Sequence, residues 1–210
     1  FFFTGKTNYR HALAKLRPYK ERLSNKPFHY HNIKAYIKGK YEWRQQEPLE
    51  ADDLMALEQC RYLGKSERQT IICSRDKDLR AVPGWHYGWE LANQPQYGPL
   101  EVKPLGAIRL SGNRKSIKGE GLLFFYAQCL TGDSVDTIPG LPRYGAVKTF
   151  ELLSHCQDEE SALKAVLEAY RGVYGDKAEE FLLEQGRLLW MTRELNEDNS
   201  VKLWEHPTVG

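Results

Sequence analysis

Three clusters of carboxylates are the residues of this chain best suited to chemistry. They supply seven acids in three short segments: Glu50, Asp52 and Asp53; Asp76 and Asp78; Asp133 and Asp136. Carboxylates gathered at one place repel one another and need cations to hold them. Oxygen ligands without histidine or cysteine select a hard ion, Mg²⁺ or Mn²⁺. If the clusters meet, the pattern predicts a centre with two metal ions that cleaves phosphodiester bonds.

The elements expected around these acids place each cluster at a junction. The first cluster opens a helix over 51–63, and the second directly follows a continuous apolar run over 69–74, which is typical of a strand covered on both faces. The third follows an apolar helix over 121–131. In an open parallel sheet, ligands bind outside the carboxyl ends of the strands, so acids at such junctions are expected to converge there.

Each cluster also has an ordinary structural explanation. Acids in the first turn of a helix complement its dipole, which accounts for Asp52 and Asp53 without a metal. An aspartate after a strand, or in a Gly-Asp-Ser sequence, is common in turns and caps. Residues 50–210 have a net charge of −6, however, and without the seven acids that charge would be +1. The acidity of this part of the chain is therefore concentrated in the three clusters.

Strands that alternate with helices, followed by helices alone, predict an α/β fold with a parallel sheet and a C-terminal helical lobe. The other strands are expected at 1–4, 41–46, 85–91 and 107–111, with a basic turn at 112–115. The other helices are expected at 10–24, 28–40, 146–154, 159–170 and 177–195.

Charge is unevenly spread along the 210 residues, although the net charge is only +2. Residues 1–49 hold 11 Lys and Arg against 3 Glu, whereas residues 50–210 hold 19 basic and 25 acidic residues. Aromatic residues such as Tyr19 are interleaved with the cations of the basic part, which include Arg10, Lys20, Arg22 and Lys26. Cations neutralise phosphates and aromatic faces stack on unpaired bases, so single-stranded nucleic acid is the expected partner.

The basic part of the chain has two other possible interpretations. A solvated basic helix face explains the charge excess equally well on charge alone. A membrane surface is not expected, because the basic segment has no continuous apolar face. No apolar run approaches the length of a membrane span either, which is about 20 residues.

The segment after the third cluster has the pattern of a helical hairpin. It runs from Asp133 through a turn rich in glycine and proline to Gly145, and a helix is expected from Ala146. Two helices around such a turn can offer backbone N–H groups to a phosphate without reading bases. Lys148, on the second helix, would add positive charge.

In this order, the sequences around the acids resemble the structure-specific 5′-nuclease (flap endonuclease) family, which includes phage 5′–3′ exonucleases and the 5′-nuclease domain of bacterial DNA polymerase I. The resemblance rests on the motifs at 50–53 (EADD), 74–79 (SRDKDL) and 130–140 (LTGDSVDTIPG), with weaker similarity at 3–10, 19–20 and 185–204. The resemblance implies a PIN-like nuclease core over 1–131 with a helical arch at about 10–40. It implies a helix-two-turn-helix and C-terminal helical region over 132–210.

The resemblance also implies a role for individual residues. All seven carboxylates fall on the family's metal-site positions. Tyr19 and Lys20 fall on the arch, where Lys20 would contact the scissile phosphate, with Arg22 as a second arch cation. Gly140, Gly145 and Lys148 fall on the hairpin that binds duplex DNA. The family has a further metal-binding aspartate on its first strand, so we expect that strand to be missing here.

The expected activity is therefore that of a Mg²⁺- or Mn²⁺-dependent 5′–3′ exonuclease or flap endonuclease. We expect a monomer that is phage-encoded and acts on duplex and single-stranded DNA in the host cytoplasm during replication. Two alternatives remain open: a non-catalytic, structure-specific DNA-binding protein, and a ribonuclease of the wider PIN group.

Overall fold

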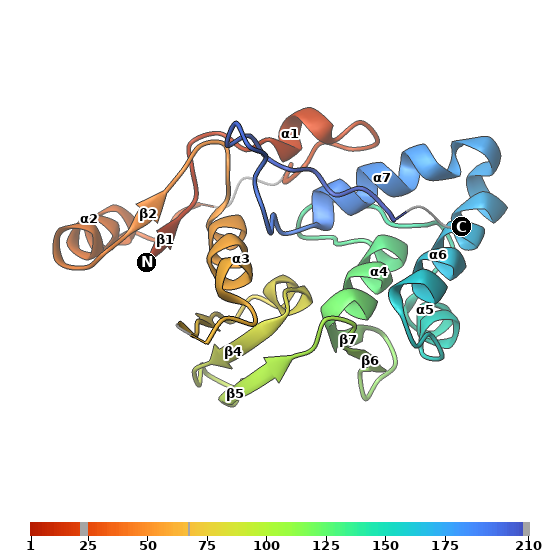
Figure 1. Ribbon diagram of the computed structural model, residues 1–210, viewed down its shortest axis with the longest axis horizontal. Coiled ribbons are helices and arrows are strands. Elements are labelled where there is room, and N and C mark those ends of the chain that lie inside the picture. Colours follow the sequence, from red (N-terminus) through yellow and green to blue (C-terminus); the bar gives the residue numbers. More distant parts are fainter. Residues whose placement is uncertain (22–24, 67, 208–210) are drawn as a thin grey trace.

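Helices and short strands alternate through the first half of the chain, and helices alone fill most of the second half (Figure 1). The structure is a computed structural model that describes residues 1–21, 25–66 and 68–207. The helices are α1 (Arg10–Leu13), α2 (Tyr30–Lys40), α3 (Ala51–Tyr62), α4 (Gly121–Thr131), α5 (Ala146–Leu153), α6 (Glu159–Tyr174) and α7 (Ala178–Leu189). The chain is mixed α/β, as predicted. Among the described ranges, no helix combines the length and apolarity needed to cross a membrane.

The strands form three small sheets rather than one continuous parallel sheet. They are β1 (Phe2–Phe3), β2 (Arg44–Gln45), β3 (Ile71–Cys73), β4 (Gly84–Gly88), β5 (Tyr97–Val102), β6 (Ala107–Leu110) and β7 (Ile117–Glu120). The pairs β1–β2 and β3–β4 are parallel, as expected. The strands β5 and β7 were not predicted, and both pair antiparallel with the strand before them. The predicted basic turn at 112–115 is the turn between β6 and β7.

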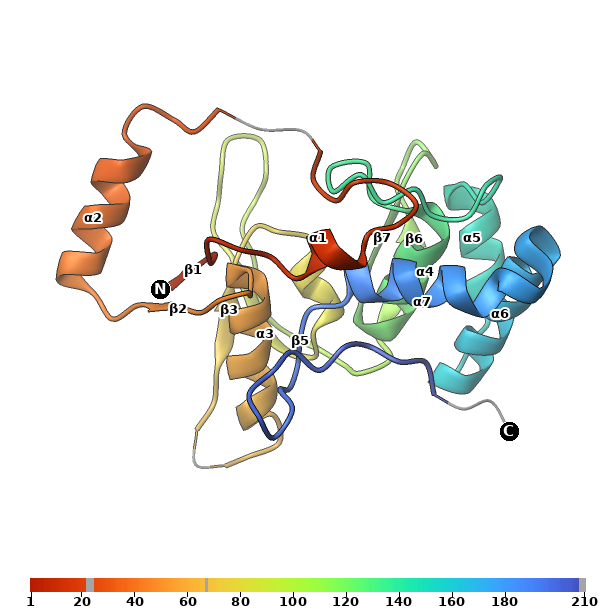
Figure 2. The same cartoon turned by 90° about the horizontal axis from the view of Figure 1, so that it is seen from above.

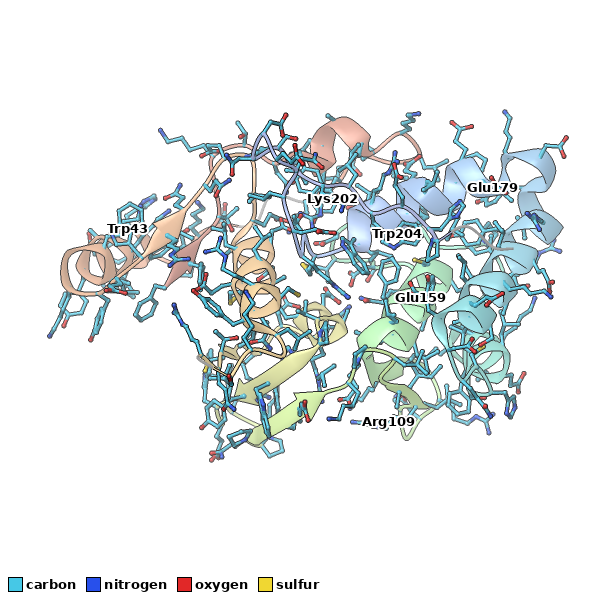
Figure 3. The ribbon with its side chains drawn as sticks, in the orientation of Figure 1. Trp43, Arg109, Glu159, Glu179, Lys202 and Trp204 are labelled. Atoms are coloured by element: carbon cyan, nitrogen blue, oxygen red, sulfur yellow. The ribbon has the colours of Figure 1, made fainter. Side chains whose placement is uncertain are left out.

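Helix α4 is the centre of the main hydrophobic core. Every residue from Gly121 to Leu130 is buried, and α4 packs against α5, α6 and α7. The ring of Phe125 contacts the rings of Trp190 and Trp204, with centroids 4.9 and 5.2 Å apart. Trp204, labelled in Figure 3, packs over Gly186 of α7, where any Cβ would overlap its ring. This packing fixes the end of α4, and hence the position of the third acidic cluster that follows it.

Strand β3 forms a smaller core with α3. Ile72 is buried with Ala56 of α3 and Leu79, but Ile71 is 43% exposed and Cys73 is exposed. The prediction that both faces of this strand are covered is therefore wrong. Only the face that carries Ile72 is packed, and β3 lies at the edge of its sheet.

The predicted helix over 10–24 ends at Leu13. The backbone N–H groups of Lys15 and Leu16 donate to Glu184 Oε1, at 2.8 and 2.7 Å, instead of to carbonyls one turn earlier. Pro18 then has no N–H to donate. Residues 22–24 lie outside the described residues. The second helix of the predicted arch, α2, lies apart from α4–α7 in both views (Figures 1 and 2).

Helix α7 is also shorter than the predicted 177–195. It ends at Leu189, where the chain turns to extended backbone at Trp190. The guanidinium of Arg10 donates to the carbonyls of Leu188 (3.0 Å) and Trp190 (2.7 Å), and the N–H of Thr192 donates to Asp53. These partners replace the helical hydrogen bonds that residues 190–195 would otherwise need.

Candidate metal centre

Six of the seven predicted carboxylates line one small cavity of about 160 Å³. They are Glu50, Asp52, Asp76, Asp78, Asp133 and Asp136. They come from three places far apart in the sequence: the start of α3, the turn after β3 and the turn after α4. The convergence predicted from the junctions therefore occurs.

The first cluster is positioned by the start of α3. Glu50 is the N-cap residue, and its backbone N–H donates to the Asp53 carboxylate in a capping box, at 3.1 Å. Leu49, immediately before the cap, is fully buried and anchors the entry of the chain. The cap thus holds Glu50 and Asp52 at the cavity while it directs Asp53 elsewhere.

The second cluster is held by a turn and by α4. The Asp76 carboxylate accepts the backbone N–H of Asp78 at 2.9 Å, and Ser74 Oγ accepts the N–H of Asp76 at 3.0 Å. Gln128 of α4 donates its Nε2 to Asp78 Oδ1 at 2.5 Å. Gln128 was not singled out from the sequence. Its signal was a lone amide in an otherwise apolar helix.

The third cluster is a tight turn directly after α4. Asp133 forms an antiparallel bridge with Ile138, and its carboxylate accepts the backbone N–H of Val135 at 2.8 Å. Asp133 is 5% exposed, whereas Val135 between the two acids is 74% exposed. Asp136 returns to the cavity, where the turn places it beside Glu50 and Lys20.

Two lysines occupy the spaces between these carboxylates. Lys20 Nζ lies 2.5 Å from Glu50 Oε1 and 3.7 Å from Asp136 Oδ1. Lys77 Nζ lies 3.1 Å from Asp78 and donates a hydrogen bond to Asp133. Among the described residues, no three His, Cys, Asp or Glu side chains are grouped to hold one metal ion. The two ammonium groups mark where the cavity requires positive charge.

The lysines leave part of the negative charge uncompensated. The pKa of Asp52 is raised to about 7 by burial, and next by the neighbouring charges of Asp76 and Glu50. Burial likewise raises the pKa values of Asp78 and Asp136, although Lys77 and Lys20 partly offset it. Oxygen-only donors with excess negative charge fit a hard divalent cation. The residues present therefore suit the ions that the sequence predicts.

Asp53 does not join the cavity, and the expected role of Arg10 in binding DNA is wrong. Arg10 is fully buried, and its two terminal nitrogens donate to the two Asp53 oxygens at 2.7 Å each. Burial acts to raise the pKa of Asp53, but the Arg10 hydrogen bonds and charge outweigh it and lower that pKa. Arg10 cannot reach a phosphate, because it neutralises a carboxylate inside the protein.

Tyr19 lies in the wall of the cavity. It is 4% exposed, and its hydroxyl lies 3.0 Å from Glu50 Oε2 and 3.1 Å from Asp136 Oδ2. A DNA contact at Tyr19 stays a prediction, and any such contact would be at the cavity. Lys20, next to it, has a left-handed backbone with φ of 49°, and its N–H donates to the Asp136 carbonyl at 3.0 Å. Such a conformation costs energy in a non-glycine residue and persists only when surrounding contacts fix it.

The remaining predicted DNA-binding residues divide into three groups. Arg22 lies outside the described residues. Gly140 is buried with φ of +66°, and its N–H donates to Gln185 Oε1 at 2.9 Å, so the expectation of a phosphate contact there is wrong. Lys26, Gly145 and Lys148 are exposed and free to meet a ligand. Lys148 Nζ lies 3.7 Å from the centroid of the Tyr144 ring.

No protein-family model matches the sequence, and no curated protein sequence matches it. Solved structures with a similar chain path include a mutant of the T5 5′-exonuclease, at 15% identity and a TM-score of 0.44, covering 89% of this chain and 82% of that one. Another is a T5 protein co-crystallized with metal ions, at 13% identity and a TM-score of 0.42, covering 88% and 83%. At these TM-scores the likeness carries no functional conclusion.

Proposed function

We propose that this chain is a divalent-metal-dependent nuclease that hydrolyses DNA phosphodiester bonds near 5′ ends or flaps, on a PIN-like core. The observation that carries the proposal is the cavity where six carboxylates from three separate segments meet beside Lys20. Six carboxylates around one small cavity repel one another, and two of them, Glu50 and Asp133, are buried, so the cluster is costly unless cations neutralise it. A phosphodiester is the substrate whose own negative charge requires such cations for attack.

Each group at the cavity has a role in this chemistry. The six carboxylates would hold two Mg²⁺ or Mn²⁺ ions, which supply Lewis-acid stabilisation of the reacting phosphate when bound. Tyr19 orients Glu50 and Asp136 through its hydroxyl. Lys20 is 38% exposed at its side chain, so its ammonium group can turn from Glu50 toward a phosphate at the cavity mouth. There it would stabilise negative charge that develops on the phosphate oxygens.

Cations on α5 and α2 support a DNA substrate. Lys148 and the N-terminal end of α5 at Gly145 can meet the phosphates of a duplex. On α2, Lys34 and Lys38 are half-buried, and Lys38 donates to Gln45 Oε1 at 2.8 Å. The exposed Tyr36 and Ile33 on the same helix complete a combination suited to an unpaired strand.

One observation favours a second candidate, a non-catalytic DNA-binding protein. Lys20 and Lys77 already neutralise carboxylates at the positions that metal ions would need. If divalent ions cannot displace them, the cavity is only a structural charge network.

A cleavage assay separates the two candidates. A DNA duplex with a 5′-labelled flap is incubated with Mg²⁺, and the products are sized. The proposal predicts products cut at or near the flap junction, none in EDTA, and strongly reduced cleavage with Asp76→Asn, which keeps an acceptor for the Asp78 N–H. Binding of the flap without any cleavage would establish the second candidate. Faster cleavage of a matched RNA flap would establish the ribonuclease alternative.

A further inference from the structure

A basic groove adjoins the acidic cavity. It encloses about 640 Å³ and its lining includes six cations, Arg75, Lys77, Arg80, Arg109, Lys115 and Lys118. Among the described residues, no carboxylate lines it. Lys77 belongs to both linings, so the groove and the cavity meet at this side chain. All six cations come from residues 50–210, the part of the chain with a net negative charge.

Three of these cations are engaged within the protein. Lys77 pairs with Asp78 and Asp133. Arg75 donates to the carbonyls of Trp89 and Pro95, at 2.8 and 3.0 Å. Arg80 forms an ion pair with Glu120 at 3.1 Å. These arginines shape the groove, and their charge is partly satisfied without a ligand.

The cations of the β6–β7 hairpin are not engaged in this way. Arg109, Lys115 and Lys118 are exposed, and none is paired with a described carboxylate. The strand register places Arg109 directly opposite Lys118. Like charges at directly opposed positions destabilise a hairpin. Figure 3 labels Arg109, which extends from β6. The protein therefore maintains an uncompensated positive pair beside its acidic cavity.

We propose that this groove binds the sugar–phosphate backbone of duplex DNA and leads one strand past Lys77 to the acidic cavity. This inference rests on the proposed function and specifies how its substrate is held. Phosphates are the expected contact, because six cations and no carboxylate give the complementary charge. The groove also reaches Gly145 and Ala146 at the start of α5, so one backbone can meet both surfaces.

The aromatic residues of the groove do not favour single-stranded DNA. The Tyr97 ring is covered by two guanidinium groups, with Arg75 and Arg80 lying 5.4 and 4.9 Å from its centroid. Phe124 is 4% exposed. These two rings are therefore poor surfaces for an unpaired base to stack on. Because the groove would contact phosphates, binding here should be independent of base sequence.

Salt-dependent binding tests the proposal without requiring cleavage. The affinity of a fluorescein-labelled blunt duplex is measured by anisotropy in EDTA across a range of KCl concentrations. For Arg109→Gln/Lys118→Gln, the slope of log affinity against log salt is expected to fall by about 1.8, which corresponds to two lost phosphate contacts. The matched control is Lys164→Gln/Lys177→Gln, which removes two exposed cations of the helical lobe and should leave the slope unchanged.

Thermal stability distinguishes a binding role from a structural one. The double variant removes a like-charge pair, so its melting temperature should equal or exceed that of the wild type. If the hairpin variant were unstable, Lys115→Gln, in the turn, should still lower the slope by about 0.9.

The outcomes separate this proposal from the proposed function. An unchanged slope in folded variants overturns the groove even if the wild type cleaves flaps with Mg²⁺. An effect confined to single-stranded DNA overturns the duplex assignment. A reduced duplex slope in a protein that never cleaves upholds the groove and contradicts only the nuclease.

Discussion

The acidic cavity and the β6–β7 hairpin differ in whether their charged side chains are paired within the protein. In and beside the cavity, Glu50, Asp133 and Asp53 have internal partners in Lys20, Lys77 and Arg10. On the hairpin, Arg109 and Lys118 face each other with no described carboxylate to pair with. The first region fixes its geometry before a ligand arrives, whereas the second leaves its charge to be neutralised by the ligand.

The largest expected effect is on the free energy of unfolding and concerns the buried ion pair of Arg10 and Asp53. Arg10→Met leaves the Asp53 carboxylate buried without its cation, so it should lower the free energy of unfolding by about 3–5 kcal/mol. Urea denaturation followed by circular dichroism measures this change. The double variant Arg10→Met/Asp53→Leu should recover much of the loss, because no charge then stays unpaired. A loss below about 1 kcal/mol for the single variant would contradict an internal charge pair.

The next effect concerns catalysis at the cavity. Asp76→Asn should lower the rate of Mg²⁺-dependent flap cleavage by about 10²–10³-fold, the range typical of removing one preorganised electrostatic group. Single-turnover rates with saturating protein measure it. Glu160→Gln, an exposed acid on α6, serves as the control and should cleave at the wild-type rate. Equal rates for the two variants would remove Asp76 from the site.

A smaller effect concerns ligand-linked stability. Mg²⁺ at 100 times its dissociation constant should stabilise the folded protein by about 2.7 kcal/mol for each ion that binds. Asp52→Asn should respond less to Mg²⁺, yet melt no lower than the wild type in EDTA, because it removes a carboxylate that its neighbours repel. Differential scanning fluorimetry across a Mg²⁺ titration tests both statements. Identical Mg²⁺ responses would show that Asp52 holds no ion.

The smallest effect concerns the open basic surface beyond the hairpin. Lys148→Ala should reduce the salt slope of duplex binding by about 0.9, the equivalent of one phosphate contact. Sequence preference should not change, since phosphate contacts carry no base information. Competition between duplexes of different sequence checks this point. A changed base preference with an unaltered slope would place Lys148 against a base edge instead.

The elements that flank the acids could be predicted because they depend on local signals. Apolar runs indicated α3, β3 and α4, whereas the convergence of Glu50, Asp76 and Asp133 was expected at the edge of one parallel sheet and occurs although the strands form three small sheets. The α/β class followed from the same alternation of elements. These features require only the pattern of residues near each other in the sequence.

Other features depend on contacts between distant residues. Arg10 looked like one more cation of a basic segment, and only its enclosure by α3 and the end of α7 reveals an internal ion pair. The N–H of Gly140 looked available until Gln185, 45 residues away, accepted it. The Arg109–Lys118 pair depends on a hairpin register that weak periodicity in short strands did not reveal.

The most direct test of the central claim is a calorimetric titration of Mn²⁺ into the full chain at neutral pH, without DNA. We expect two ions to bind the wild type and to displace Lys20 and Lys77 from the carboxylates. We expect Asp52→Asn/Asp76→Asn, its fold checked by circular dichroism, to bind fewer ions or to bind them far more weakly. Two bound ions in the wild type with loss in this variant is the predicted result. No binding in the millimolar range, or identical binding by the two proteins, would contradict a metal centre at this cavity.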